Sequence, residues 1–176
     1  MFFLHGLDSS GNGTKGRFFA KHFPEIHRPD FTGNLEKRLA QLDALCKAKN
    51  QLILTGSSFG GLMACRYALT HGPQVARLIL LAPALNFEGY RPPEHPLSIP
   101  TLLVIGTKDT VTPIDPVVAL AEATFSESIV WTVDDDHLLH NTFERLDWQG
   151  LFDTDTDLAT IRPPDGTRRE ISSRSQ

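Results

Sequence analysis

The fold is decided by the stretch Gln51-Leu-Ile-Leu-Thr-Gly-Ser-Ser-Phe-Gly-Gly-Leu-Met-Ala-Cys65, in which one apolar run leads through Gly-x-Ser-x-Gly into another. This spacing predicts a buried strand, a sharp turn and a helix, because glycines two residues either side of a serine leave room for a tight turn. Ser58 in that turn is the candidate nucleophile. Free N–H groups at the start of the helix favour nearby negative charge, which makes the Phe59 N–H a candidate oxyanion donor. The alternative, that Gly60 and Gly61 only allow close packing of helix on sheet, leaves both serines unexplained.

The composition of the whole chain is that of an ordinary globular domain. We expect one domain over residues 1–160 and a mobile polar tail over 161–176. The net charge of −4 gives no general attraction to nucleic acid or to an anionic membrane, so the expected partner is a small-molecule substrate. The sequence shows neither a signal-peptide pattern nor a run of membrane-spanning length, which predicts a cytoplasmic location. Cys46 and Cys65 lie in apolar helical stretches, where free thiols behave as small hydrophobes.

A glycine-rich loop follows the first predicted strand. Phe2-Phe-Leu4 leads into His5-Gly-Leu-Asp-Ser-Ser-Gly-Asn-Gly-Thr-Lys-Gly16. One interpretation is a phosphate loop at Gly11-Asn-Gly-Thr-Lys15, but a P-loop needs lysine followed by serine or threonine, and here threonine comes first. We favour a second interpretation, in which the backbone bends so that the Leu7 N–H becomes the other oxyanion donor. His5 is then a structural residue that holds the loop through its ring nitrogens.

Four further strands are expected, over residues 24–31, 75–81, 100–105 and 129–133, and residues 34–46 form a scaffold helix. Asp109 and His137 each stand just beyond one of the last two strands. Because the carboxyl ends of parallel strands meet at one edge of a sheet, we expect these side chains to serve as acid and base. Asp109 has an alternative role as a turn former or helix cap, which Asp115 also fits, and His140 is the rival base.

Two other segments attract attention. The proline-rich segment 86–98 is too short for a cap domain, and its Phe87 and Tyr90 are either walls of a substrate pocket or anchors of the loop. Asp153-Thr-Asp-Thr-Asp157 has the spacing of half a calcium loop, but Leu158 stands where that loop needs glycine. We therefore predict no metal site and no cofactor.

Taken together, the chain order of His5-Gly6-Leu7, Ser58, Asp109 and His137 resembles the α/β-hydrolase superfamily over almost all of residues 1–160. Within it the chain is similar to small, nearly lidless bacterial esterases. Gly106-Thr-Lys-Asp-Thr-Val-Thr-Pro113 is similar to their acid-residue segment, and Asp136-His137 to their histidine segment.

The resemblance implies an α/β class fold, a single-domain α/β-hydrolase fold with helices on both faces and a minimal lid. It implies about six parallel strands in the order 2-1-3-4-5-6, with the first two strands of the family absent. The implied function is hydrolysis of a small carboxylester or thioester by a Ser58-His137-Asp109 triad through an acyl-enzyme intermediate. The alternatives are a noncatalytic ligand-binding or interaction protein on the same fold, and nucleotide binding by residues 11–15.

Overall fold

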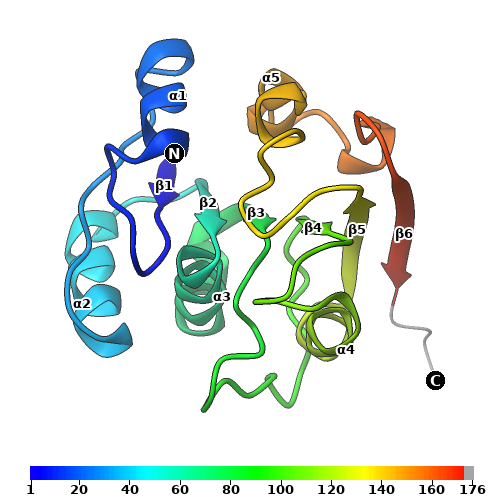
Figure 1. Cartoon of the computed structure of the whole chain (residues 1–176). Coiled ribbons are helices and arrows are strands. Elements are labelled where there is room, and N and C mark those ends of the chain that lie inside the picture. The colour runs from blue at the N-terminus through cyan, green and yellow to red at the C-terminus, as the bar shows by residue number, and fades with distance from the viewer. Residues whose placement is uncertain (173–176) are drawn as a thin grey trace.

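The computed structural model describes residues 1–172, which form a six-stranded sheet in the order β1-β2-β3-β4-β5-β6 (Figure 1). The strands are β1 (Phe2–Leu4), β2 (Leu52–Ser57), β3 (Val75–Leu81), β4 (Thr101–Gly106), β5 (Glu127–Val133) and β6 (Thr167–Ser172). Strands β1 to β5 are parallel, and β6 runs antiparallel to β5. The expected α/β class is confirmed.

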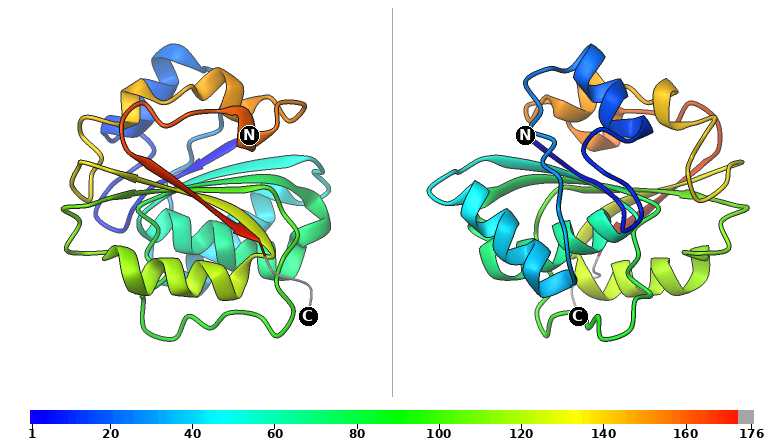
Figure 2. Two further views of the ribbon diagram at one scale, coloured as in Figure 1. Left: turned by 90° about the vertical axis from the view of Figure 1, so that its right-hand side faces the viewer. Right: turned by 60° about the vertical axis from the view of Figure 1, so that its left-hand side comes forward.

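Helices cover both faces of this sheet, as the views of Figure 2 show. The helices are α1 (Thr14–His22), α2 (Leu35–Cys46), α3 (Phe59–His71), α4 (Ile114–Thr124) and α5 (Trp148–Phe152), with short 3-10 turns at Gly72–Gln74, Phe143–Arg145 and Leu158–Thr160. One apolar cluster lies between the sheet and the layer of α2, α3 and α4, and a second lies under α1 and α5. Because both faces are covered, the inner strands β2, β3 and β4 are apolar almost throughout. No helix in residues 1–172 combines the length and the apolar character needed to cross a bilayer.

The segment expected as the second strand, residues 24–31, lies beside β1 but does not form a strand. It contributes a single bridge between Phe2 and His27, with the Phe3 N–H donating to the His27 carbonyl at 2.8 Å. Pro24 and Pro29 lack the N–H groups that a longer ladder would use. The predicted position next to β1 is therefore right, whereas the predicted strand is wrong.

The polar tail expected over residues 161–176 is corrected in part, because residues 167–172 form β6. The register pairs Glu127 with Ser172 and Thr132 with Thr167 along the edge of β5. Edge strands often carry charged side chains, which prevent further pairing, and Arg168, Arg169 and Glu170 give β6 this character. Main-chain hydrogen bonds to β5 form this strand, so it does not need the alternation of apolar residues by which a strand is recognised in a sequence. The rest of the predicted tail, residues 173–176, lies outside the described residues.

The connections that follow β1 and β2 lead to opposite faces of the sheet. The helix that follows β1 lies on one face, and α3, which follows β2 directly, lies on the other (Figure 1). The chain therefore leaves the two neighbouring strands in opposite directions. Such a divergence is where parallel α/β sheets bind their ligands.

Candidate active site

The turn between β2 and α3 holds Ser58 in a strained conformation. Ser58 has φ 54° and ψ −116°, a backbone region that residues with a side chain rarely adopt. Glycine is required on both sides of this turn because neighbouring backbone atoms lie where a side chain would be. A Cβ on Gly56 would lie 2.3 Å from the Gly60 carbonyl oxygen, and one on Gly60 would lie 1.9 Å from the Leu4 carbonyl oxygen. The Gly-x-Ser-x-Gly motif therefore packs α3 tightly against β1 and β2 and presents Ser58 at the carboxyl edge.

Ser58, His137 and Asp109 form a continuous chain of hydrogen bonds. Ser58 Oγ lies 3.0 Å from His137 Nε2, and His137 Nδ1 lies 2.8 Å from Asp109 Oδ2. The three residues follow β2, β5 and β4, as the sequence predicts. The Asp109 side chain is fully buried and the imidazole is 18% exposed, so the hydrogen-bonded chain is shielded from solvent at its aspartate end.

Asp109 fills both roles considered for it in the sequence. Its Oδ1 accepts the N–H groups of Val111 and Thr112, both at 2.8 Å, which closes the turn before α4. Its Oδ2 faces His137 and also accepts the Thr112 hydroxyl at 2.5 Å. Burial by itself raises the pKa of Asp109, but the hydrogen bonds from Thr112, His137 and Val111 outweigh it and hold the pKa below its usual value. Asp109 is therefore a stable anion behind the imidazole.

Thr112 is a site residue that the sequence interpretation missed. It is completely buried, and its hydroxyl also lies 3.3 Å from His137 Nδ1. The sequence pattern that could have identified Thr112 is Asp-x-x-Thr after a strand, because a threonine three residues after an aspartate can donate a hydrogen bond back to it in a turn.

The other carboxylates near His137 have partners of their own. Asp134 pairs with Lys108 Nζ at 2.8 Å, and Asp136 pairs with the exposed His140 at 2.7 Å. Asp135 is buried and accepts backbone N–H groups of its own loop. The run of three aspartates thus shapes the loop, and the rival base His140 lies outside the hydrogen-bonded chain.

The two expected oxyanion donors flank the nucleophile. Phe59 is the first residue of α3, and Gly6, which precedes Leu7, lies so close that a Cβ built on it would be 3.6 Å from Ser58 Cβ. Within residues 1–172, neither the Leu7 nor the Phe59 N–H has a backbone acceptor. Neither N–H group is therefore occupied by a main-chain partner.

The two aromatic residues of the 86–98 loop have different environments. Phe87 is 44% exposed, and its ring packs edge-on against Phe59 at 5.3 Å between centroids, beside the nucleophile turn. Tyr90 is 3% exposed, and its hydroxyl lies 2.7 Å from Thr124 Oγ1 in the core. Burial raises the pKa of Tyr90. Of the two roles expected for Tyr90, its burial in the core supports that of a loop anchor.

The glycine-rich loop before α1 does not have the geometry of a phosphate site. The Gly11 N–H donates to the Asp30 carboxylate at 2.5 Å, and the Lys15 ammonium donates to the Leu138 carbonyl at 2.5 Å. A carboxylate thus occupies a position that a phosphate oxygen would need. Lys15 instead connects this loop to the loop that carries His137.

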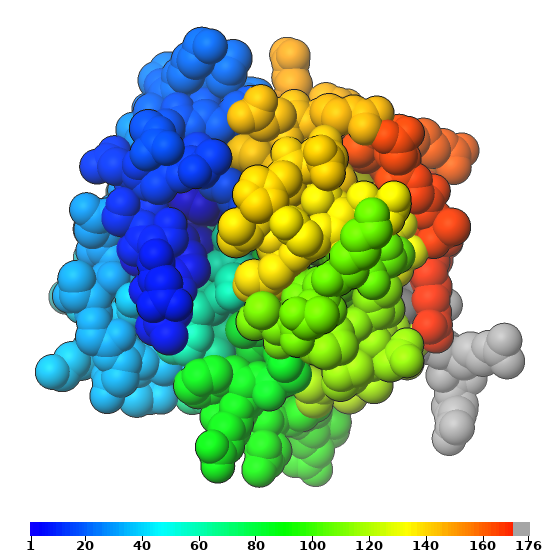
Figure 3. Space-filling view, in the orientation of Figure 1, coloured from blue at the N-terminus to red at the C-terminus, as the bar shows by residue number. Residues whose placement is uncertain are grey.

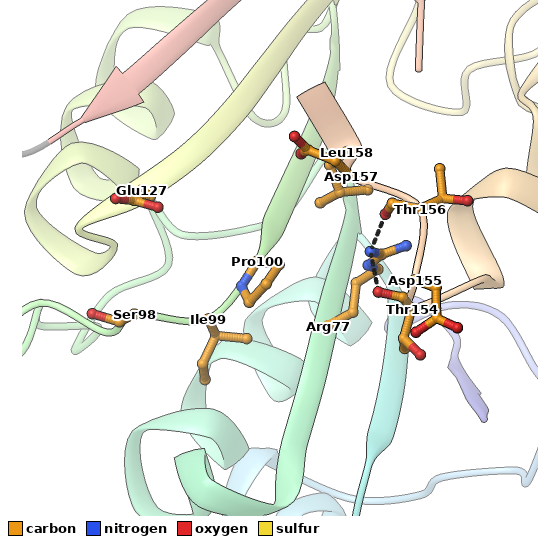
Figure 4. Close-up of a pocket in the computed structure, with 10 residues that line it drawn as sticks. All are labelled: Arg77, Ser98, Ile99, Pro100, Glu127, Thr154, Asp155, Thr156, Asp157 and Leu158. Carbon is orange, nitrogen blue, oxygen red and sulfur yellow. Dashed lines mark hydrogen bonds between the residues drawn. The ribbon is translucent and has the colours of Figure 1, made fainter. Parts of the chain in front are cut away.

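The Asp153–Asp157 loop surrounds a side chain of the protein itself. The Arg77 guanidinium is buried and donates to the Asp153 carbonyl at 2.7 Å. It also donates to the carbonyls of Thr156 at 2.6 Å and Thr154 at 3.4 Å, as Figure 4 shows. A cavity of about 430 Å³ adjoins this loop and includes Pro100, just before β4. It lies at the amino edge of the sheet, opposite Ser58, and is not part of the candidate active site.

Comparison with known proteins identifies relatives of this architecture. A family model described as serine aminopeptidase, S33, matches residues 2–97. A putative α/β-superfamily hydrolase from Xanthomonas campestris is 25% identical, with a TM-score of 0.67 over 82% of this chain and 91% of that chain. A YdeN-like putative hydrolase from Pectobacterium atrosepticum is 22% identical, with a TM-score of 0.66 over 92% of each chain.

An esterase from Exiguobacterium antarcticum has the same fold at 17% identity, with a TM-score of 0.64 over 82% of this chain and 86% of that chain. None of the curated proteins matches the sequence. The family model covers more than half of the 176 residues, and it begins at β1 and includes the nucleophile turn. The chain therefore belongs to the hydrolase family described as serine aminopeptidase, S33, within the α/β-hydrolase superfamily.

Proposed function

We propose that the protein is a serine hydrolase that cleaves a small carboxylester or thioester through an acyl-enzyme intermediate. The observation that carries the proposal is the hydrogen-bonded chain from Ser58 Oγ through His137 to Asp109. A serine hydroxyl at its ordinary pKa is a weak nucleophile and needs an oriented base within hydrogen-bond reach. The distances of 3.0 and 2.8 Å meet that requirement.

The proton movements follow from the partners of each atom. Asp109 is ionised and accepts from His137 Nδ1, so the neutral imidazole carries its proton on Nδ1 and leaves Nε2 free to accept. Nε2 takes the Ser58 proton as Oγ attacks the acyl carbon, and then gives it to the departing alkoxide or thiolate. Water repeats the cycle on the acyl-enzyme, releases the acid and restores Ser58.

Negative charge develops on the carbonyl oxygen during both attacks. The N–H groups of Leu7 and Phe59 are the donors proposed to hold it. Loss of one such donor typically raises the barrier by about 3 kcal/mol. We expect their contribution to be greatest in the transition state, because the ground-state carbonyl oxygen is less negative.

The surroundings of Ser58 favour an apolar acyl group. Exposed large apolar side chains in the described residues include Leu7, Phe87, Val111 and Leu138. Each lies next to a site residue, on the loops that follow β1, β3, β4 and β5. In Figure 3 the blue loop after β1, the green loops and the yellow loop after β5 meet on one face of the molecule. An apolar chain placed there removes apolar surface from water, at about 25 cal/mol per Å².

The experiment is a series of p-nitrophenyl esters and acyl thioesters of increasing chain length, combined with labelling by a fluorophosphonate. We expect turnover and covalent labelling of the wild type, and loss of both in Ser58→Ala. Ser57→Ala is the matched control and should keep both. Labelling that survives in Ser58→Ala and disappears in Ser57→Ala would refute the assignment. Absence of turnover and of labelling in the wild type would favour the noncatalytic alternative.

Phe87→Ala tests the apolar acyl site separately. The ring is exposed and contacts Phe59 from the outside, so its removal should leave the fold intact. We expect KM to rise for longer acyl chains and to stay unchanged for acetyl esters. An equal effect on all chain lengths would mean that Phe87 does not contact the acyl group.

A further inference from the structure

The peptide groups on both sides of Leu7 are held by buried side chains. The Gly6 carbonyl lies 2.7 Å from His5 Nδ1, and the Leu7 carbonyl accepts a hydrogen bond from Arg38 Nη2 at 3.1 Å. His5 is 1% exposed and Arg38 is 4% exposed. With both carbonyls held, the φ and ψ of Leu7, and hence the direction of its N–H, are restricted.

The tautomer of His5 follows from its two partners. The Phe31 N–H donates to His5 Nε2 at 2.9 Å, so this nitrogen is an acceptor without a proton. Nδ1 therefore carries the proton and donates to the Gly6 carbonyl. Because the C=O and N–H of a trans peptide point in opposite directions, the Leu7 N–H is directed away from His5.

Arg38 contacts both residues whose N–H groups are the proposed oxyanion donors. Besides the Leu7 carbonyl, it donates from Nε to the Gly33 carbonyl at 3.0 Å, which fixes the guanidinium plane. The guanidinium carbon lies 5.4 Å from the centroid of the Phe59 ring. Arg38 extends from α2, whereas Leu7 follows β1 and Phe59 begins α3 (Figure 1). One side chain thus connects α2, the loop after β1 and the start of α3.

Arg38 makes no ion pair within residues 1–172, and its Nη1 is buried without a hydrogen-bond partner. Burial lowers the pKa of Arg38, and the negative charge of Asp8, in the loop after β1, partly opposes this effect. An arginine remains charged in proteins. Arg38 is thus a buried cation without a direct salt bridge, an arrangement that is costly.

We propose that Arg38 is a positioning residue of the oxyanion hole, which holds the Leu7 peptide and adds positive potential where the carbonyl oxygen becomes negative. The inference rests on the proposed function. Its physical basis is that fixed charges and dipoles stabilise a developing charge without reorganising during the reaction. Arg38 acts through Leu7 and Phe59 and does not contact the reacting atoms.

The test compares Arg38→Gln and Arg38→Lys with Arg77→Gln. Arg77 is the matched control, because it is another buried arginine that donates to loop carbonyls, at the opposite edge of the sheet. For each folded variant we would measure kcat and KM for a p-nitrophenyl ester, and the inhibition constant of a trifluoromethyl ketone, which forms a tetrahedral adduct.

We expect Arg38→Gln to lower kcat by about 10- to 100-fold with little change in KM, and to weaken the trifluoromethyl ketone by a similar factor. Arg38→Lys keeps the charge and should lose less. It also serves as the test variant if Arg38→Gln does not fold. Arg77→Gln should lower Tm and leave kcat and the inhibition constant of the folded protein unchanged.

If both Arg38 variants keep the kcat and the inhibition constant of the wild type, the inference is overturned and the proposed function stays intact. The same holds if these variants lower only Tm, as Arg77→Gln does. A wild-type protein without ester turnover and without labelling at Ser58 would overturn the proposed function and this inference together.

Discussion

Asp135 is predicted to hold together the loop that carries His137. Its carboxylate is 2% exposed and accepts the backbone N–H groups of Asp136 at 2.9 Å, Asn141 at 2.9 Å and Thr142 at 2.8 Å. Asp135→Asn keeps the shape of the side chain. It replaces one carboxylate oxygen by an NH₂ group, which cannot accept from the N–H groups it would face.

The magnitude follows from the number of bonds. A hydrogen bond to a charged acceptor contributes about 1.5–3 kcal/mol, and asparagine retains one or two of the three. We therefore expect the free energy of unfolding of Asp135→Asn to fall by about 2–4 kcal/mol at pH 7. For a domain of this size each kcal/mol lowers Tm by about 2–4 °C. We also expect a lower kcat, because a looser loop orients His137 less well.

The effect should depend on pH. Burial raises the pKa of Asp135, but the hydrogen bonds from its own loop outweigh it and hold the pKa below the usual value of 3.8. A carboxyl group with a lower pKa in the folded state stabilises the protein above its unfolded-state pKa, and that stabilisation is lost as the pH falls through the folded-state pKa. The difference between wild type and Asp135→Asn should thus be full at pH 7 and shrink at pH values below 3.8.

The assay is urea denaturation of the wild type, Asp135→Asn and Asp134→Asn at pH 7 and at acidic pH. Asp134→Asn is the control, because Asp134 is exposed and its partners, the Lys108 ammonium and the Thr107 hydroxyl, are exposed as well, so its loss should have little effect. The reasoning is refuted if Asp135→Asn unfolds within about 0.5 kcal/mol of the wild type at pH 7. A difference that stays constant down to the lowest pH would refute the role of the charge.

Three further predictions concern the base, the buried threonine and the edge strand. His137→Ala should lower kcat/KM by about three orders of magnitude or more and His140→Ala much less, measured on purified folded variants, and the reverse ranking would move the base to His140. Thr112→Val removes a donor to Asp109, so it should raise the pKa of that carboxyl and lower the free energy of unfolding at pH 7 by about 1.5–3 kcal/mol in urea denaturation. A chain that ends after Arg162 lacks β6, so we expect a lower Tm in calorimetry and a tendency to associate through the uncovered edge of β5. An unchanged Tm would show that β6 contributes nothing to stability.

Part of this architecture is determined by short stretches of sequence. Gly56 and Gly60 determine the turn at Ser58, because any Cβ at either position would collide with backbone a few residues away or on the neighbouring strand. The continuous apolar runs determine β2, β3 and β4, because strands covered on both faces have no solvent side. Those two signals are sufficient to predict the fold class and the edge of the sheet where Ser58 lies.

The remaining features depend on contacts between residues far apart in the chain. Arg38 and Leu7 are separated by 31 positions, and no local pattern shows that a residue of an amphipathic helix will hold an N-terminal loop. The sequence around Tyr90 predicts a loop, but the path of that loop places the Tyr90 side chain in the core. The polar strand β6 forms because β5 offers it an unpaired edge. Propensity and periodicity describe a segment alone, whereas these three outcomes depend on which surface the folded chain brings beside it.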